Sequence, residues 1–235
     1  MRDRVHSCAL RWGSLVAIAV LLMAAPPSEA DGKLSLYGIR MMPSGKDAED
    51  FSRPGWGGGV QVVFPVPQLA DLFAGVGGLE YVNLLNATTV IYDSETLLRV
   101  EQQTDQYYAR LYLGSEFGPH GRGFLRPHVG VDLAASFYGI STDVVVPDDS
   151  GRQQEIRQDL RDEDRVAMGY DVNAGVDLNF RNRVSVDAGV KFLKSFNVPQ
   201  QLGSGSVPIS PGYFQIYLGV GISLGTLQKS GSQEQ

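Results

Sequence analysis

The sequence predicts an all-β fold: an eight-stranded antiparallel up-and-down transmembrane β-barrel, preceded by a cleavable signal peptide. Residues 166–180 and 214–224 alternate between apolar and polar side chains, the pattern of strands with one apolar face. Both segments reach the roughly 9 to 11 residues that a tilted strand needs to cross hydrocarbon. An export signal and an even number of such strands complete the prediction.

The signal peptide is expected to span residues 1–30. Three arginines precede an apolar run over residues 15–25, which is too short for a membrane-spanning helix. Small residues at Ser28 and Ala30 predict cleavage after Ala30. Cys8 would leave with the signal, so the exported chain would lack disulfides and thiolate metal ligands. The net charge of −6 for the whole sequence argues against nucleic acid as a partner.

The exported chain is expected to form one barrel domain, residues 31–225, followed by a polar C-terminal tail, residues 226–235. Its eight strands are predicted at residues 34–42, 57–66, 75–84, 106–117, 125–137, 166–180, 183–192 and 214–224.

The first four strands differ in the clarity of their pattern. The first alternates poorly, whereas the second sets Val60, Val62 and Phe64 on one parity. In the third strand Glu80 lies between apolar neighbours, and in the fourth Arg110 lies on the parity opposite the leucines. Both strands therefore place a charge on the inner face.

The last four strands alternate more regularly. The fifth carries its polar residues, Arg126 to Ser136, on one parity, and Pro127 lies near its start, where a β-ladder tolerates proline. The sixth strand, residues 166–180, and the eighth, residues 214–224, are the two segments whose alternation predicts the fold. The seventh sets valine, alanine and phenylalanine outward against Asp187 and Lys191.

The connections alternate in length, which predicts an orientation. Short turns of such barrels face the periplasm and long loops face outward. The long outer loops are expected at residues 43–56, 85–105, 139–165 and 194–212, and both termini are expected to be periplasmic.

Aromatic residues are expected at the two membrane interfaces, where their rings lie at headgroup depth. Phe64, Phe117 and Phe180 fall at the periplasmic end of their strands. The outer girdle is predicted to contain Trp56, Tyr107, Phe137, Tyr170, Phe192 and Phe214.

The inner parity predicts a charged lumen, because side chains fill an eight-stranded barrel. Buried charges must pair, which favours Arg110 with Glu80 or Asp132, and Lys191 with Asp187 or Asp177. A structural filling role is favoured over conduction. The expected network comprises Glu80, Arg110, Arg126, His128, Asp132, Asp171, Asp177, Asp187 and Lys191, and Arg40 and Glu116 are also expected to point inward.

Two short phrases resemble a known family. Residues 78–81, Gly-Leu-Glu-Tyr, and 126–131, Arg-Pro-His-Val-Gly-Val, are similar to strand phrases of the opacity and OmpA-like eight-stranded outer-membrane β-barrels. The resemblance implies a bacterial outer-membrane location, contact with membrane lipid and lipopolysaccharide, and recognition by the outer-membrane insertion machinery. Members commonly end on an aromatic residue, whereas here a polar tail follows Leu224.

We therefore expect a non-enzymatic envelope protein whose long surface loops serve adhesion or recognition of an extracellular ligand or host surface. The alternatives are a narrow porin-like channel for small solutes or ions, and a secreted lipocalin-like ligand-binding barrel with an apolar interior. Catalysis is disfavoured because Ser136 lies roughly 26 Å from His128 along its strand. No catalytic residue, cofactor or metal site is predicted, since the acidic residues of the loop at 139–165 lack the spacing of a calcium loop.

Overall fold

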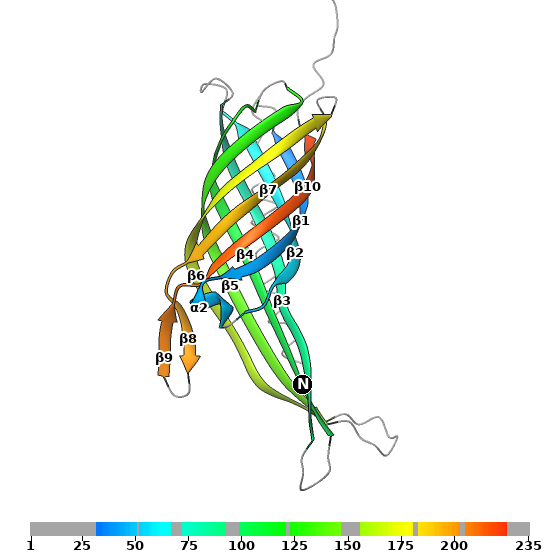
Figure 1. The fold of residues 1–235 in the computed structure, drawn as a ribbon, viewed down its shortest axis with the longest axis vertical. Helices are drawn as coiled ribbons and strands as arrows, with labels where there is room; N and C mark the ends of the chain where they lie inside the picture. The colour runs from blue at the N-terminus through cyan, green and yellow to red at the C-terminus, as the bar shows by residue number, and fades with distance from the viewer. Residues whose placement is uncertain are drawn as a thin grey trace, which may run out of the picture. The chain divides into compact units, whose positions relative to one another are not determined.

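The computed structural model shows a closed antiparallel barrel of eight strands in the order β1-β10-β7-β6-β5-β4-β3-β2 (Figure 1). The structure describes residues 32–50, 52–66, 72–92, 99–120, 123–146, 156–180, 183–202 and 205–224. The barrel strands are β1 (Lys33–Ser44), β2 (Gly55–Pro65), β3 (Phe73–Tyr92), β4 (Arg99–Phe117), β5 (Leu125–Val146), β6 (Ile156–Phe180), β7 (Val184–Ser195) and β10 (Gly212–Ser223). The predicted fold class and strand number are confirmed.

All described residues lie in one compact unit within residues 31–235. The predicted signal peptide and the tail at 226–235 lie outside the described residues. No helix in the described part of the chain is long and apolar enough to cross a membrane.

The barrel closes where β1 pairs with β10, from Lys33↔Ser223 to Ser44↔Gly212. The register around the barrel fixes its stagger. Following the paired residues from Tyr213 through β7, β6, β5, β4, β3 and β2 leads to Lys33 on β1, whereas the direct partner of Tyr213 on β1 is Pro43, ten positions further. A stagger of this size tilts the strands by roughly 35 to 45° and leaves a lumen that side chains can fill.

The two faces of the wall differ in chemistry. The exterior carries large apolar side chains, including Leu36, Leu133 and Leu218, which are 68%, 68% and 62% exposed. The inner parity is buried and mostly polar or aromatic. This arrangement is the reverse of a lipocalin-like barrel, whose apolar residues would face inward.

Four strands continue past the rim of the barrel as a sheet (Figure 1). We call this part, residues 85–92, 99–106, 139–146 and 156–168 of β3 to β6, the outer sheet; it is paired as far as Tyr92↔Arg99, Glu101↔Val145 and Val146↔Ile156. The prediction of loops at residues 85–105 and 139–165 was therefore wrong over much of their length. Its four segments lack the regular alternation of apolar and polar residues that marks the barrel strands, so the sequence pattern did not predict strands there.

The same rim carries two small elements that the sequence analysis treated as loop. Helix α2 (Lys46–Glu49) follows β1, and a hairpin of β8 (Val198–Leu202) and β9 (Gly205–Ile209) separates β7 from β10. We call this the outer end of the barrel. The opposite end, with the β2–β3, β4–β5 and β6–β7 connections and the Lys33↔Ser223 end of the closing seam, is the turn end.

Replacing Leu218 with arginine tests the apolar exterior. Leu218 lies on the outer face of the wall away from both ends, so a charge there is expected to cost about 2–4 kcal/mol of unfolding free energy when the exterior meets hydrocarbon. Denaturant unfolding in lipid vesicles measures the loss. Val207→Arg, on the exposed face of β9, is the control, and equal losses at both positions would contradict a hydrocarbon-facing wall.

Candidate functional site

A buried ion-pair cluster fills the middle of the lumen. Arg110 on β4 lies between two carboxylates, with Nε 2.8 Å from Glu80 Oε2 and Nη2 2.8 Å from Asp171 Oδ2. Lys191 Nζ on β7 lies 3.0 Å from Glu80 Oε1, and the Tyr37 hydroxyl donates to the same oxygen at 2.7 Å. Each cation therefore contacts a carboxylate, which offsets much of the cost of burying it.

Aromatic rings and a third acid complete this central cluster. The Arg110 guanidinium carbon and Lys191 Nζ lie 4.6 Å and 4.4 Å from the centre of the Tyr112 ring. Asp132 on β5 is the direct ladder partner of Asp171 on β6. Asn173 Nδ2 donates a hydrogen bond to Asp132 Oδ2 at 3.2 Å. The cluster thus holds three carboxyl groups against two cations.

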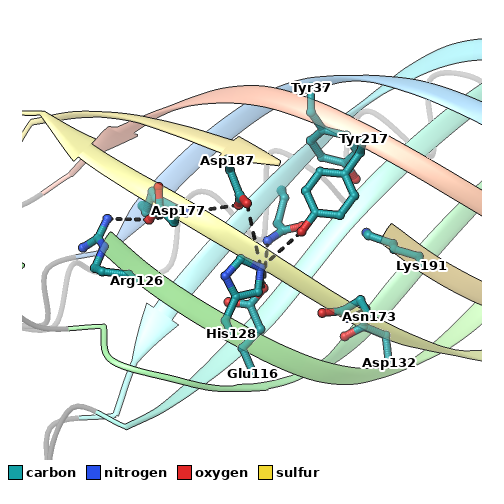
Figure 2. Close-up of polar contacts among 12 residues, drawn as sticks. Tyr37, Glu116, Arg126, His128, Asp132, Asn173, Asp177, Asp187, Lys191 and Tyr217 are labelled. Atoms are coloured by element: carbon teal, nitrogen blue, oxygen red, sulfur yellow. Dashed lines mark hydrogen bonds and ion pairs between the residues drawn. The ribbon is translucent and has the colours of Figure 1, made fainter. Parts of the chain in front are cut away.

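A second polar cluster lies nearer the turn end (Figure 2). Asp177 pairs with Lys33 and Arg126, at 3.0 Å and 2.5 Å, and Lys33 Nζ also lies 3.4 Å from Asp187 Oδ2. His128 Nε2 lies 3.1 Å from the Tyr217 hydroxyl and 3.8 Å from Asp187 Oδ1.

The backbone around this cluster leaves room for its rings. A Cβ atom on Gly175 or Gly189 would lie 2.5 Å from the Tyr217 hydroxyl. Glycine at both positions is therefore required by the side chains of the lumen.

His120 lies in the turn beyond β4. Burial lowers the pKa of its side chain, and its carbonyl oxygen accepts a hydrogen bond from Arg126 Nη1 at 3.4 Å.

The outer end of the lumen is closed by apolar and aromatic side chains, which we call the plug. Tyr108 packs against Tyr138 and Tyr213 with ring centres 5.0 Å and 5.7 Å apart. Helix α2 adds Ala48 and the segment after β7 adds Val198, both buried in the same cluster. The plug comprises Ile39, Met41, Ala48, Val82, Leu84, Tyr108, Tyr138, Ala167, Leu193, Val198 and Tyr213.

The strand patterns do not predict the plug, because its residues come from several barrel strands and two rim elements. The alternation of each strand could have identified its inward members. No comparable sequence pattern predicts that α2 and Val198 contribute to the plug.

The structure brings the predicted network residues into the lumen, in the two clusters. Arg110 contacts Glu80, one of its two proposed partners, and also Asp171. Lys191 contacts Glu80, so its predicted pairing with Asp187 or Asp177 was wrong. Those two acids instead contact Lys33, which the sequence analysis overlooked.

Arg40 is a second correction. On β1 the buried residues are Ser35, Tyr37, Ile39 and Met41, so Arg40 lies on the outer face. Its guanidinium carbon lies 4.7 Å from the centre of the Trp56 ring, on the neighbouring strand. Arg40 therefore contacts an aromatic ring on the exterior near the outer end, so its predicted inward orientation was wrong.

The predicted interface aromatics lie on the exterior. Trp56, Phe192 and Phe214 are exposed near the outer end, and Phe192 is the direct ladder partner of Phe214. Tyr107, Phe137 and Tyr170 are half-buried. Phe64, Phe117 and Phe180 are exposed toward the turn end.

These aromatic groups define a band along the wall. Tyr170 and Phe180 lie on one strand and are about 33 Å apart along it at the usual rise per residue. With the strand tilt, this is roughly 25 Å along the barrel axis, the height of an apolar band in membrane barrels.

His128 and Ser136, the two residues considered for catalysis, do not contact each other and have different hydrogen-bond partners. The Ser136 hydroxyl lies 3.0 Å from that of Tyr108 and 3.5 Å from that of Ser195, within the outer half of the lumen. His128 contacts Tyr217, Glu116 and Asp187. Within the described residues, no group of three or more histidine, cysteine or acidic side chains is arranged to hold a metal ion.

Above the plug, a small cavity of about 50 Å³ separates the outer sheet from α2 and the β8–β9 hairpin. Its walls combine Tyr138 and Tyr213 with Asp47, Glu163 and Arg165. Asp47 Oδ2 accepts a bond from the Ser210 backbone at 3.1 Å, and Arg165 pairs with Glu163. The first contact connects α2 to the segment that follows β9, whereas the second lies within β6.

No protein-family profile matches the chain, and no curated protein matches it. Among solved structures, Neisserial surface protein A is similar, with 13% identity over 83% of this chain and 97% of that chain and a TM-score of 0.53. A major outer membrane protein from Thermus thermophilus (13% identity, 82% and 98% coverage, TM-score 0.46) and Ail of Yersinia pestis (13%, 83% and 99%, 0.44) also match. The first similarity confirms the predicted fold, that of the small eight-stranded outer-membrane barrels.

Removing one charge from each side of the central cluster tests its energetics. Arg110→Met leaves Glu80 and Asp171 without their shared cation, and is expected to lower the unfolding free energy by roughly 3–5 kcal/mol. Asp132→Asn keeps the side-chain shape and removes one of three carboxyl groups that face two cations, so its effect is expected to be small. Denaturant unfolding in vesicles measures both. A larger loss for Asp132→Asn than for Arg110→Met would contradict the assigned pairing.

Proposed function

We propose that this chain is a non-enzymatic integral protein of the bacterial outer membrane, whose function is carried by the outer sheet and rim elements. The observation that carries the proposal is the distribution of side chains: an apolar wall, a lumen closed by the plug, and strands that continue beyond the aromatic band. The barrel anchors and the part beyond it makes contact with an extracellular ligand or surface.

The apolar wall supports insertion in a bilayer. Every strand of the barrel is paired on both sides, so no backbone group of the wall needs water. The predicted export signal supports the outer membrane as the destination, with the insertion machinery, lipid and lipopolysaccharide as its partners there. The alternation of short and long connections supports an orientation with the turn end and both termini in the periplasm.

The plug disfavours the channel alternative. A conducting path needs polar, hydrated space, whereas Ile39, Met41, Leu84 and Leu193 are almost fully buried across the outer end. Below them Arg110 and Lys191 are each fixed between acids and aromatic rings. We therefore assign the lumen charges a structural role in filling the barrel and fixing its register.

Single-channel recording distinguishes the proposed membrane anchor from the alternative function as a channel. The purified protein in planar bilayers is expected to show no steady open state, because the plug and the central cluster block the lumen. The matched comparison is a variant with Leu193→Gly and Tyr213→Gly, which removes bulk from the plug. A large steady conductance of the unaltered protein would favour the channel.

A protease-site insertion tests membrane location and orientation together. A cleavage sequence inserted after Asp149, between β5 and β6, is expected to be cut when intact cells are treated with protease. The same sequence inserted after Asn182, between β6 and β7, is expected to be protected until the outer membrane is permeabilised. The opposite pattern would reverse the orientation, and cutting of both sites only in lysed cells would place the protein elsewhere.

A further inference from the structure

The outer sheet has two edges that the barrel does not close. Strand β2 pairs with β3 only as far as Trp56↔Asn83, and β7 pairs with β6 only as far as Ser195↔Gly169. Residues 85–92 of β3 are therefore paired to β4 on one side, and among the described residues no strand lies on their other side. Such an edge presents a row of backbone donors and acceptors that another strand can use.

The two edges differ in how they are protected. Residues 156–165 of β6 read Ile-Arg-Gln-Asp-Leu-Arg-Asp-Glu-Asp-Arg, and dense charge of this kind is a usual means of preventing edge-to-edge pairing. Residues 85–92 of β3 read Leu-Asn-Ala-Thr-Thr-Val-Ile-Tyr. This edge has no charge, proline or glycine, and its centre is β-branched, which favours an extended strand.

A β-bulge lies where this solvent-exposed segment of β3 begins. The β3–β4 register shifts between Asn83 and Leu85, and Leu84 is buried in the plug. Beyond the shift, Asn86, Thr88, Thr89 and Val90 are exposed. Consecutive exposed residues mean that both faces of the edge strand are accessible to a partner.

We infer that residues 85–92 pair antiparallel with the same segment of a second copy of this chain. The segment is complementary to itself: centred on Thr88, threonine faces threonine and Asn86 faces Val90, with no like charges opposed. The contact is two-fold and closed, because each copy uses its single uncharged edge. Pairing of β3 with β6 of another copy would instead leave an edge free and continue without limit.

The strand direction determines where the second copy lies. Residues 85–92 continue the β3 strand of the barrel wall, which is tilted by roughly 35 to 45° from the barrel axis. In an antiparallel pair the two barrels extend away from the contact in opposing directions. They cannot share one membrane in the same orientation, so the contact joins two membranes whose outer faces meet.

The membrane-to-membrane arrangement rests on the proposed function, whereas the strand pairing does not. A contact of eight residues per copy is small and is expected to be weak for one pair of molecules. Many copies on two facing surfaces act together, which raises the avidity without any new contact.

A cysteine scan tests the strand pairing in detergent. The one cysteine of the sequence, Cys8, is replaced by serine, and single cysteines are placed at Asn86, Thr88 or Val90. Oxidation is expected to link copies through Thr88→Cys, where the symmetric pair brings the sulfur atoms together, and weakly through Asn86→Cys or Val90→Cys alone. Mixing the last two variants is expected to restore the link, because these positions face each other.

The control for the scan is Ser141→Cys, on an inner strand of the same sheet. Cross-linking of Ser141→Cys as efficient as that of Thr88→Cys would indicate random collision and overturn the pairing. Maximal linking at Thr89→Cys, tested in the same series, would support the pairing with its centre moved by one residue.

A charge exchange tests the contact between membranes. Vesicles that display the protein are expected to aggregate, and Thr88→Lys or Thr88→Glu alone is expected to abolish aggregation, because like charges then meet across the two-fold axis. Mixing lysine and glutamate vesicles is expected to restore it. Gln103→Lys and Gln103→Glu, on the neighbouring strand directly beside Thr88, are the matched controls and are expected to leave aggregation unchanged.

The outcomes of the two experiments are distinct. Aggregation that survives both Thr88 substitutions, or that mixing fails to restore, overturns the contact between membranes. Site-specific cross-linking without vesicle aggregation supports the strand pairing and overturns the arrangement between two membranes. The protease-site insertions report on the proposed function independently of either result.

Discussion

Closure of the sheet is the constraint on which the rest of the structure depends. The β1–β10 seam leaves each strand of the wall with a neighbour on both sides, which is the condition for a β-structure in hydrocarbon. The ten-residue stagger that accompanies closure sets the width of the lumen, and that width decides that side chains, rather than water, occupy it. The apolar exterior and the paired interior charges both follow.

Beyond the aromatic band the constraint is relaxed, and the structure changes accordingly. The four strands β3 to β6 leave the closed wall and form an open sheet, while α2 and the start of β8 contribute Ala48 and Val198 to the plug at the rim. The plug lies at this boundary. It separates the charged lumen from the outer sheet, so the closed barrel and the outer sheet are distinct parts of one continuous set of strands.

The sequence predicts the wall better than anything else, because lipid imposes a parity that can be read from single strands. Eight strands and the inward position of Glu80, Arg110 and Lys191 follow from that parity. Arg40 does not, because β1 alternates poorly and the arginine lies over the exposed ring of Trp56. Other features depend on information that no single strand carries. The partner of Lys191 depends on the stagger, which places Glu80 beside it. The outer sheet was not predicted because its strands lack the apolar alternation that lipid imposes on the barrel wall.

The continuity of β3 to β6 has a mechanical consequence. A pull applied to the tip of the outer sheet runs along strands that enter the wall without a hinge, apart from the bulges near Leu84 and Thr142 (Figure 1). The load is then shared by many cross-strand hydrogen bonds strained in parallel, instead of opening them one after another. The connection between the outer sheet and the closed barrel is therefore stiff. Under the proposed function, drag on an attached body reaches the bilayer through the wall itself.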